Sequence, residues 1–137
     1  MRIKRLAATG SMALALAGAG LVTATPANAA ISCNYGMACL HYNSNFEGAI
    51  LNQQYAISNY DGYRFSASVY DNGGSGAGSG VKNNAASVQN NDPNFAFRVY
   101  YNSNFNGTYA QQTIMGWDAA NLNATMKNNN ASGQFLD

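Results

Sequence analysis

The stretch Tyr42-Asn43-Ser44-Asn45-Phe46-Glu47-Gly48 decides the fold, because the chain repeats it almost without change. The second copy is Tyr101-Asn102-Ser103-Asn104-Phe105-Asn106-Gly107, and its only difference is Asn106 in place of Glu47. A shorter segment repeats in the same order: Lys82 to Ser87 (KNNAAS) follows the first copy, and Lys127 to Ser132 (KNNNAS) follows the second. Such an internal repeat predicts two copies of one supersecondary structure that share a core.

The residues that lead into each copy predict a β-strand. From Phe95 to Tyr101 every second residue is large and apolar, which is the period of a half-buried strand. The first copy shows a weaker version of this alternation from Ala38 to Tyr42. The side chains expected to point inward are Phe95, Phe97, Val99 and Tyr101 in one strand and Ala38, Leu40 and Tyr42 in the other.

Each copy then continues as a tight hairpin. The Asn-Ser-Asn segment favours a turn, because its side chains can hydrogen-bond to the local backbone. The glycine that ends the motif, Gly48 or Gly107, is expected to supply a positive φ that other residues resist. We therefore expect two hairpins folded back on themselves, each covered by an aromatic ring. Short strands between such turns predict an all-β chain.

The order Tyr-x-x-x-Phe-x-Gly followed by Asn-Asn-x-x-Ser resembles the Greek-key signature of the βγ-crystallin superfamily. The resemblance implies two Greek-key motifs that form a single βγ-crystallin-like β-sandwich. It also implies that Tyr42 and Phe46 occupy positions equivalent to those of Tyr101 and Phe105.

The run from Cys33 to Leu40 (CNYGMACL) leads directly into the first motif and narrows this resemblance. Together with the segment from Lys82 to Asn91 (KNNAASVQNN), it is similar to a small secreted peptidase-inhibitor family of actinobacteria, typified by a metalloproteinase inhibitor. The resemblance covers essentially all of the mature chain. It implies a protein that is not an enzyme and whose partner is an extracellular protease, with a metalloprotease as the expected class.

Residues 1–29 predict a secretory signal peptide. They combine a basic start, an apolar run from Met12 to Val22 and the cleavage pattern Ala27-Asn28-Ala29. The alternative is a retained membrane anchor, but the apolar run is shorter than the ~20 residues that a membrane-spanning helix needs. We therefore expect a secreted, extracellular protein whose single domain spans residues 30–137.

The charge of the mature chain limits its partners. Without the leader, four basic residues stand against six acidic ones, a net charge of −2. Nucleic acids and anionic membranes require clustered positive charge, so neither is expected as a partner. We expect the mature protein to be a monomer that is not attached to a membrane.

Cys33 and Cys39 are the chain's two cysteines, and the leader directs them to an oxidising compartment. An even pair in that compartment predicts a disulfide. The alternative is a redox pair or a metal site, but only His41 lies nearby, whereas structural zinc sites usually have four ligands. The short loop between the cysteines predicts a stabilisation of roughly 2–3 kcal/mol.

Two further segments give expectations about packing. The Gly/Ser-rich segment from Asp71 to Gly80 is expected to be a flexible surface insertion. The alternative is a partner-binding loop, although the segment lacks the aromatic or Arg anchors of tight interfaces. Trp117, the only tryptophan, is expected in the core at one end of the sandwich, and Asp118 is expected to cap a single helical turn.

No catalytic set is predicted. The single histidine, His41, lies on a predicted strand beside Tyr42, and no segment resembles a nucleophile elbow. Paired carboxylates suited to glycoside hydrolysis are absent from the sequence. We therefore interpret His41 as structural.

The repeated Asn-rich segments predict a weak calcium site, by resemblance to calcium-binding βγ-crystallins. Ca²⁺ takes about six to eight oxygen ligands, which amide groups, hydroxyls and backbone carbonyls can supply. The alternative is that each serine only ties a hairpin down by hydrogen bonds. The expected ligands, with each site drawing on both repeats, are Glu47, Asn83, Asn84, Ser87, Asn106, Asn128, Asn129 and Ser132.

Two classes of function therefore follow from the sequence. The first is a secreted inhibitor of an extracellular peptidase, and the second is a calcium-binding or purely structural extracellular module. Fold alone does not decide between them.

Overall fold

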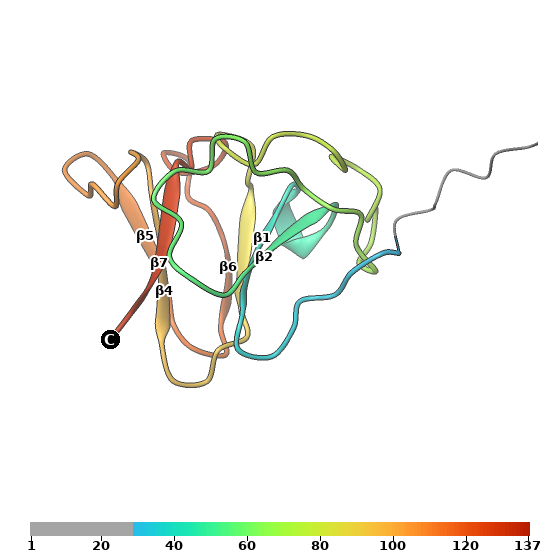
Figure 1. The fold of residues 1–137 in the computed structure, drawn as a ribbon, viewed down its shortest axis with the longest axis horizontal. Coiled ribbons are helices and arrows are strands. Elements are labelled where there is room, and N and C mark those ends of the chain that lie inside the picture. Colours follow the sequence, from blue (N-terminus) through green and yellow to red (C-terminus); the bar gives the residue numbers. More distant parts are fainter. Residues whose placement is uncertain (1–28) are drawn as a thin grey trace, which may run out of the picture.

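Short strands and one 3₁₀ turn make up the regular structure of residues 29–137, the part of the chain that the computed structural model describes (Figure 1). The elements are β1 (Ala38–His41), the 3₁₀ turn η1 (Ser44–Phe46), β2 (Ile50–Gln53), β3 (Ser87–Asn90), β4 (Ala96–Tyr100), β5 (Gln111–Ile114), β6 (Ala119–Asn121) and β7 (Ser132–Leu136). The all-β prediction is confirmed. The predicted leader lies outside the described residues except for Ala29. Within the described part, no helix is long and apolar enough to cross a bilayer.

The strands form two antiparallel sheets. One sheet has the order β2-β1-β3-β6 and the other has the order β5-β4-β7. Buried side chains from both sheets belong to one apolar cluster, with Leu40 and Val88 from the first sheet and Phe97 and Val99 from the second. The two sheets therefore pack as a sandwich around a shared core.

Each sheet is built mainly from one half of the chain and is joined by residues from the other half. Strand β6, from the second half, pairs with β3 of the first half, with Val88 opposite Ala120. Reciprocally, Ile57 of the first half pairs with Gly133 in β7, through hydrogen bonds of 2.9 and 3.1 Å in the two directions. This exchange makes neither half complete without the other.

The predicted alternation holds for the middle of each strand and fails at its ends. Phe97 and Val99 are fully buried, but Phe95 precedes β4 and is exposed. In β1 all four residues are buried, because both faces of this strand are covered. On the second face, the ring of His41 packs edge-on against the ring of Tyr70 at a centroid distance of 5.1 Å.

The two motifs fold as matching hairpins. Positive φ values occur at the same two positions in each copy, at Asn45 and Phe46 (61° and 62°) and at Asn104 and Phe105 (60° and 56°). Gly48 also has the predicted positive φ, of 80°. The prediction is wrong for Gly107, whose φ is not positive. The hairpin fold is therefore carried by the Asn-Phe pair more than by the glycine.

The Gly/Ser-rich segment lies on the surface as expected, but hydrogen bonds tie its backbone to the body of the protein. Its backbone accepts hydrogen bonds from Gly48 and Ala49, both at 2.8 Å, and exchanges hydrogen bonds with Phe65 at 2.8 and 3.0 Å. At Gly76 the backbone lies directly on the ring of Tyr42, where a Cβ atom would come within 2.1 Å. Glycine permits this close approach, because it has no side chain to hold the two apart.

The disulfide prediction is confirmed. Cys33 and Cys39 are bonded, with their Cα atoms 5.8 Å apart. The bridge encloses the turn at Gly36, which has a φ of 75°. The loop is further tied to the body of the protein by the side chain of Asn91, which donates to the carbonyl of Cys33 at 3.0 Å.

Trp117 lies on the surface, and the prediction that it fills the core is wrong. It sits in the turn between β5 and β6 with a φ of 59°, and its side chain is 61% exposed. The predicted helical turn at Asp118 is likewise a simple turn, in which its amide donates to Met115 at 3.2 Å. The largest fully buried side chains are instead Tyr60, Phe97 and Leu40.

Candidate functional site

Two small pockets lie beside the folded hairpins, and we call them the hairpin pockets. The first has a volume of about 260 Å³ and is lined by Tyr42, Asn43, Ser44, Asn84, Ala86, Lys127 and Asn128. The second has a volume of about 220 Å³ and is lined by Lys82, Asn83, Tyr101, Asn102, Ser103, Asn129 and Ala131. Every residue of the first pocket has its counterpart from the other repeat in the second.

The hairpin pockets bring together four of the eight predicted calcium ligands. Asn84 lies with Asn128 in the first pocket, and Asn83 lies with Asn129 in the second, so each pair joins the two repeats. Asn84 donates from its side-chain nitrogen to the carbonyl of Gly80 at 2.8 Å. Its counterpart Asn129 donates in the same way to an equivalent carbonyl at 3.0 Å. These bonds fix the orientation of both side chains and leave the amide oxygens available.

The two predicted serine ligands are used inside the fold. The hydroxyl of Ser87 donates to the carbonyl of Asn43 at 2.6 Å and accepts from the amide of Phe46 at 3.0 Å. The hydroxyl of Ser132 makes the equivalent bonds to the second hairpin, at 2.7 and 3.1 Å. Both serines are fully buried. Each one ties its hairpin to the following strand, which is the structural alternative considered from the sequence.

The remaining two predicted ligands lie at the hairpin tips and do not line either hairpin pocket. The carbonyl of Glu47 accepts a hydrogen bond from the amide of Asn43 at 3.1 Å, and its carboxylate accepts from the side chain of Asn72 at 2.7 Å. The side-chain oxygen of Asn106 accepts from the amide of Thr108 at 2.9 Å. Both tips are therefore closed by their own hydrogen bonds.

The charge of the hairpin pockets is unfavourable for a cation. Each pocket is lined by one lysine, Lys127 or Lys82, and by no carboxylate. Among the described residues, no three His, Cys, Asp or Glu side chains come close enough to hold a metal ion. The amide oxygens are of the kind that Ca²⁺ prefers, but affinity falls as the number of charged ligands falls. The donor set fits a weakly held ion only.

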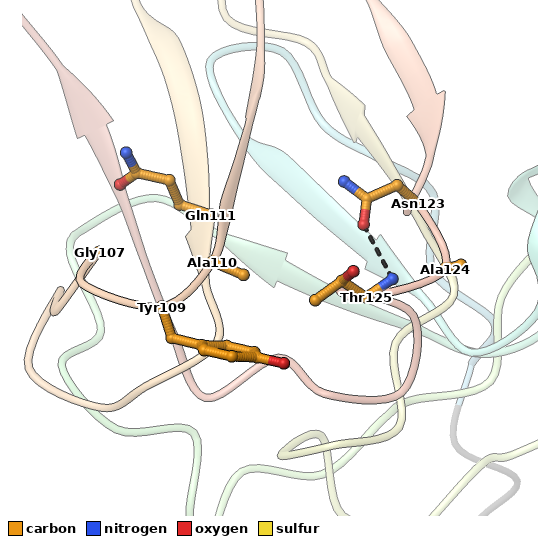
Figure 2. A pocket seen from close by; sticks show the side chains of 7 residues that line it. All are labelled: Gly107, Tyr109, Ala110, Gln111, Asn123, Ala124 and Thr125. Atoms are coloured by element: carbon orange, nitrogen blue, oxygen red, sulfur yellow. Dashed lines mark hydrogen bonds between the residues drawn. The ribbon is translucent and has the colours of Figure 1, made fainter.

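A larger open groove lies next to the second hairpin (Figure 2). It has a volume of about 730 Å³ between the residues that precede and begin β5 and the turn that follows β6. In that turn, the side chain of Asn123 accepts a hydrogen bond from the amide of Thr125 at 3.0 Å, as Figure 2 shows. Its lining is Gly107, Tyr109, Ala110, Gln111, Asn123, Ala124 and Thr125. The groove carries no acid, no base and no nucleophile pair, so it suits contact rather than catalysis.

His41 lies in the core, fully buried, with no hydrogen-bond partner for either ring nitrogen. Burial lowers its pKa from 6.5 to about 4, because the charged imidazolium would lose its hydration, and the nearby side chain of Gln89 offsets part of this shift. It is neutral near pH 7 and shielded from any substrate. This placement agrees with the structural interpretation of the residue.

Large side chains are exposed together at the end of the sandwich opposite the hairpins, a surface that the sequence patterns do not predict. We call it the aromatic end, and its members are Tyr35 (73% exposed), Tyr55 (75%), Phe95 (41%), Met115 (62%) and Trp117 (61%). Two grooves open there, with volumes of about 490 and 300 Å³, and both are lined by Gln54 and Tyr55. Each of these residues lies just outside the end of a strand. Large apolar residues at such positions are the sequence signal that could have indicated this surface.

Comparison with known proteins gives a family and a fold. A family model described as peptidase inhibitor family I36 matches residues 26–112. A solved structure described as "Evolution of the eye lens beta-gamma-crystallin domain fold" is similar, with a TM-score of 0.58 and 15% identity over 77% of this chain and 90% of that chain. At this identity the likeness shows the fold alone, and it confirms the predicted βγ-crystallin-like sandwich. The search of curated proteins gave no match.

Proposed function

The chain belongs to the peptidase inhibitor family I36, and from this premise we propose that it is a secreted inhibitor of an extracellular metalloprotease. The observation that carries the proposal is the family match over residues 26–112. The family is one of inhibitors, so the chain is not an enzyme. The burial of its single histidine agrees with that conclusion.

The rigidity of the fold supports inhibition by occupation of a peptidase cleft. An inhibitor that is already held in its bound shape loses less conformational entropy on binding. The disulfide between Cys33 and Cys39 and the hydrogen bonds of the Gly/Ser-rich segment both restrain surface loops. The predicted leader and the disulfide support export to an oxidising compartment, where an extracellular peptidase would be met.

A panel of purified metallo-, serine and cysteine peptidases tests this function. We expect the mature chain, residues 30–137, to inhibit at least one metalloprotease stoichiometrically. If only serine or cysteine peptidases are inhibited, the chain is still an inhibitor, but the metalloprotease assignment is wrong. If no peptidase is inhibited, the inhibitor function itself is wrong. N-terminal sequencing of the exported protein tests secretion, with Ala30 expected as the first residue.

The second candidate function is weak calcium binding at the hairpin pockets. It is favoured by one observation: asparagines from one repeat meet the hairpin of the other repeat in both pockets. The lysine in each pocket opposes it. Extracellular modules can nevertheless use dissociation constants of about 10⁻⁴–10⁻³ M, because calcium outside cells is often abundant.

Thermal unfolding with and without calcium tests this candidate. Ligand that binds only the folded state stabilises it by about 2.7 kcal/mol at a hundredfold excess over the dissociation constant. If a calcium site exists, Lys127→Gln should strengthen it by removing a like charge from the first pocket. An unchanged melting temperature in millimolar calcium, together with no heat of binding, would leave the Asn-rich segments as structural elements only.

A further inference from the structure

We propose that the aromatic end is the surface by which this chain binds its peptidase, a proposal that rests on the proposed inhibitor function. The alternatives are the Gly/Ser-rich segment, the hairpin pockets and the open groove beside the second hairpin. The first is packed against Tyr42 and Phe65 and carries no anchor side chain. The hairpin pockets each present a lysine, a residue depleted in protein interfaces. The open groove has a single aromatic side chain, Tyr109, among small and polar residues.

The aromatic end has the composition of a binding surface. Tyr, Trp, Phe and Met are enriched in protein interfaces, and Trp and Tyr are the commonest residues whose removal strongly weakens binding. Five of the eight exposed large apolar side chains of the described chain belong to this end. Two of these rings also contact one another: Tyr35 and Trp117 pack edge-on, with their ring centroids 5.7 Å apart.

Backbone hydrogen bonds join the separate loops of the aromatic end into one unit. Gly36 donates to the carbonyl of Asn91 at 3.0 Å, and Asn91 donates back to Met37 at 2.8 Å. Trp117 donates to the carbonyl of Asp92 at 3.1 Å. In Figure 1 the loop between β3 and β4 and the loop between β5 and β6 both lie along the lower edge of the molecule, near the chain before β1.

A buried asparagine holds these loops in place from below. Asn90, at the end of β3, is fully buried, and its side-chain nitrogen donates to the carbonyls of Phe95, Ile114 and Met115 at 2.9, 3.2 and 3.2 Å. Its side-chain oxygen accepts from the amide of Asp92 at 3.0 Å. One side chain thus fixes two of the loops that carry exposed apolar residues. This preorganisation lowers the entropic cost of binding.

Charge indicates the kind of surface that the aromatic end would meet. Asp92 and Asp137 line the groove beside Phe95, and Asp118 follows Trp117 directly. None of the four basic residues of the described chain lies in these loops. The aromatic end is therefore an apolar centre with an acidic rim. Its complement is a peptidase surface with an apolar cleft and a neutral or basic border.

Inhibition constants of three variants test the proposal against the peptidase that the wild type inhibits. Trp117→Asn removes the indole and keeps a residue that tolerates the left-handed backbone, and Tyr35→Ser removes its partner ring. Val69→Ser is the control, because Val69 is 63% exposed and lines none of the pockets or grooves described above. We expect the first two variants to weaken inhibition roughly tenfold or more each, and the control to stay within about twofold.

Each result decides between the proposals. If the wild type inhibits a peptidase and both aromatic-end variants inhibit equally well, the aromatic end is not the contact surface, although the inhibitor function stands. If no peptidase is inhibited, both proposals fall. If the wild type sediments as a dimer that Trp117→Asn dissociates, the aromatic end binds a second copy and the peptidase contact is overturned.

Hydrogen exchange of the wild-type complex gives a measurement that needs no variant. We expect the amides of residues 35–37 and 115–118 to become protected when the peptidase binds, and those near Tyr109 to remain unchanged. Protection confined to the hairpins would overturn the proposal even if a variant failed to fold.

Discussion

His41 is a buried base whose ring nitrogens have no hydrogen-bond partners, and its protonation opposes folding. The pKa is about 4 in the folded state and 6.5 in the unfolded chain, so the unfolded chain binds more protons between these values. We expect the free energy of unfolding to be constant above about pH 6.5, to fall by roughly 3 kcal/mol as the pH drops to about 4, and then to level off for this group. Urea unfolding over this pH range measures the change.

The control for this pH dependence is His41→Phe, which keeps a flat ring beside Phe46 and Tyr70 but does not titrate. Its stability should vary much less over the same interval. Parallel loss of stability in the wild type and the variant would assign the effect to the carboxylates instead.

The two hairpin serines should have equal effects, because they make the same contacts. Ser87→Ala or Ser132→Ala removes two hydrogen bonds and leaves a hairpin carbonyl and amide without partners. We expect each to lower the free energy of unfolding by about 1–3 kcal/mol. Ser44→Ala, a hairpin serine that lines a pocket, should change it by less than about 0.5 kcal/mol. If Ser87→Ala or Ser132→Ala is as stable as Ser44→Ala, the hairpins do not depend on the hydrogen bonds of these serines.

At the scale of elements, two glycines of the Gly/Ser-rich segment separate packing from backbone strain. Gly76 and Gly78 have nearly the same φ, 83° and 82°, so alanine strains both backbones alike. Only at Gly76 does the added methyl group meet the ring of Tyr42. We expect Gly78→Ala to cost about 1–2 kcal/mol and Gly76→Ala to cost about 1–3 kcal/mol more. Equal thermal destabilisation of the two variants would mean that the segment moves freely off the ring.

The sequence predicted elements whose signals are local. Period-two alternation identified the cores of β1 and β4, and the Asn-rich repeats identified both hairpins and their serines. The pairings that were missed depend on contacts distant in sequence, such as Ile57 with Gly133. The close packing at Gly76 was missed for the same reason, since a run of glycines indicates flexibility until a partner surface is known.

At the scale of the whole molecule, the exchange of strands between the halves predicts cooperative unfolding. A fragment of residues 30–91 lacks β6 and leaves the edge of β3 unpaired, and a fragment of residues 92–137 lacks Ile57 beside β7. Chains of this size bury a small share of their surface and are marginally stable, so the loss of a pairing strand is expected to unfold them. We expect neither fragment to fold by itself and the intact chain to unfold in a single transition.

Far- and near-ultraviolet circular dichroism, followed through one urea titration, measure this cooperativity. The two transitions should coincide for the intact chain, and each fragment should show none. A cooperative melt from either fragment would show that one half is an independent unit.

The candidate surfaces could be predicted only in part for a similar reason. The hairpin pockets follow from the repeat, which aligns Asn84 with Asn129 and so pairs the halves. The aromatic end has no repeat, and the period-two pattern predicts that its member Phe95 points inward. Its residues come from separate loops, and their proximity depends on the buried side chain of Asn90. The sequence predicts Trp117 in the core, whereas it lies in a left-handed turn with its side chain exposed.

The position of Trp117 also gives the protein a built-in optical label. It is the chain's only indole, and it is open to solvent at the end opposite the folded hairpins. Its fluorescence, selected by excitation beyond the tyrosine band, should be red-shifted and readily quenched by acrylamide. Docking of a tryptophan-free molecule over this end should shift the emission to the blue and shield it from the quencher. Ions that enter the hairpin pockets should leave the spectrum unchanged, so one measurement reports which end of the molecule is occupied.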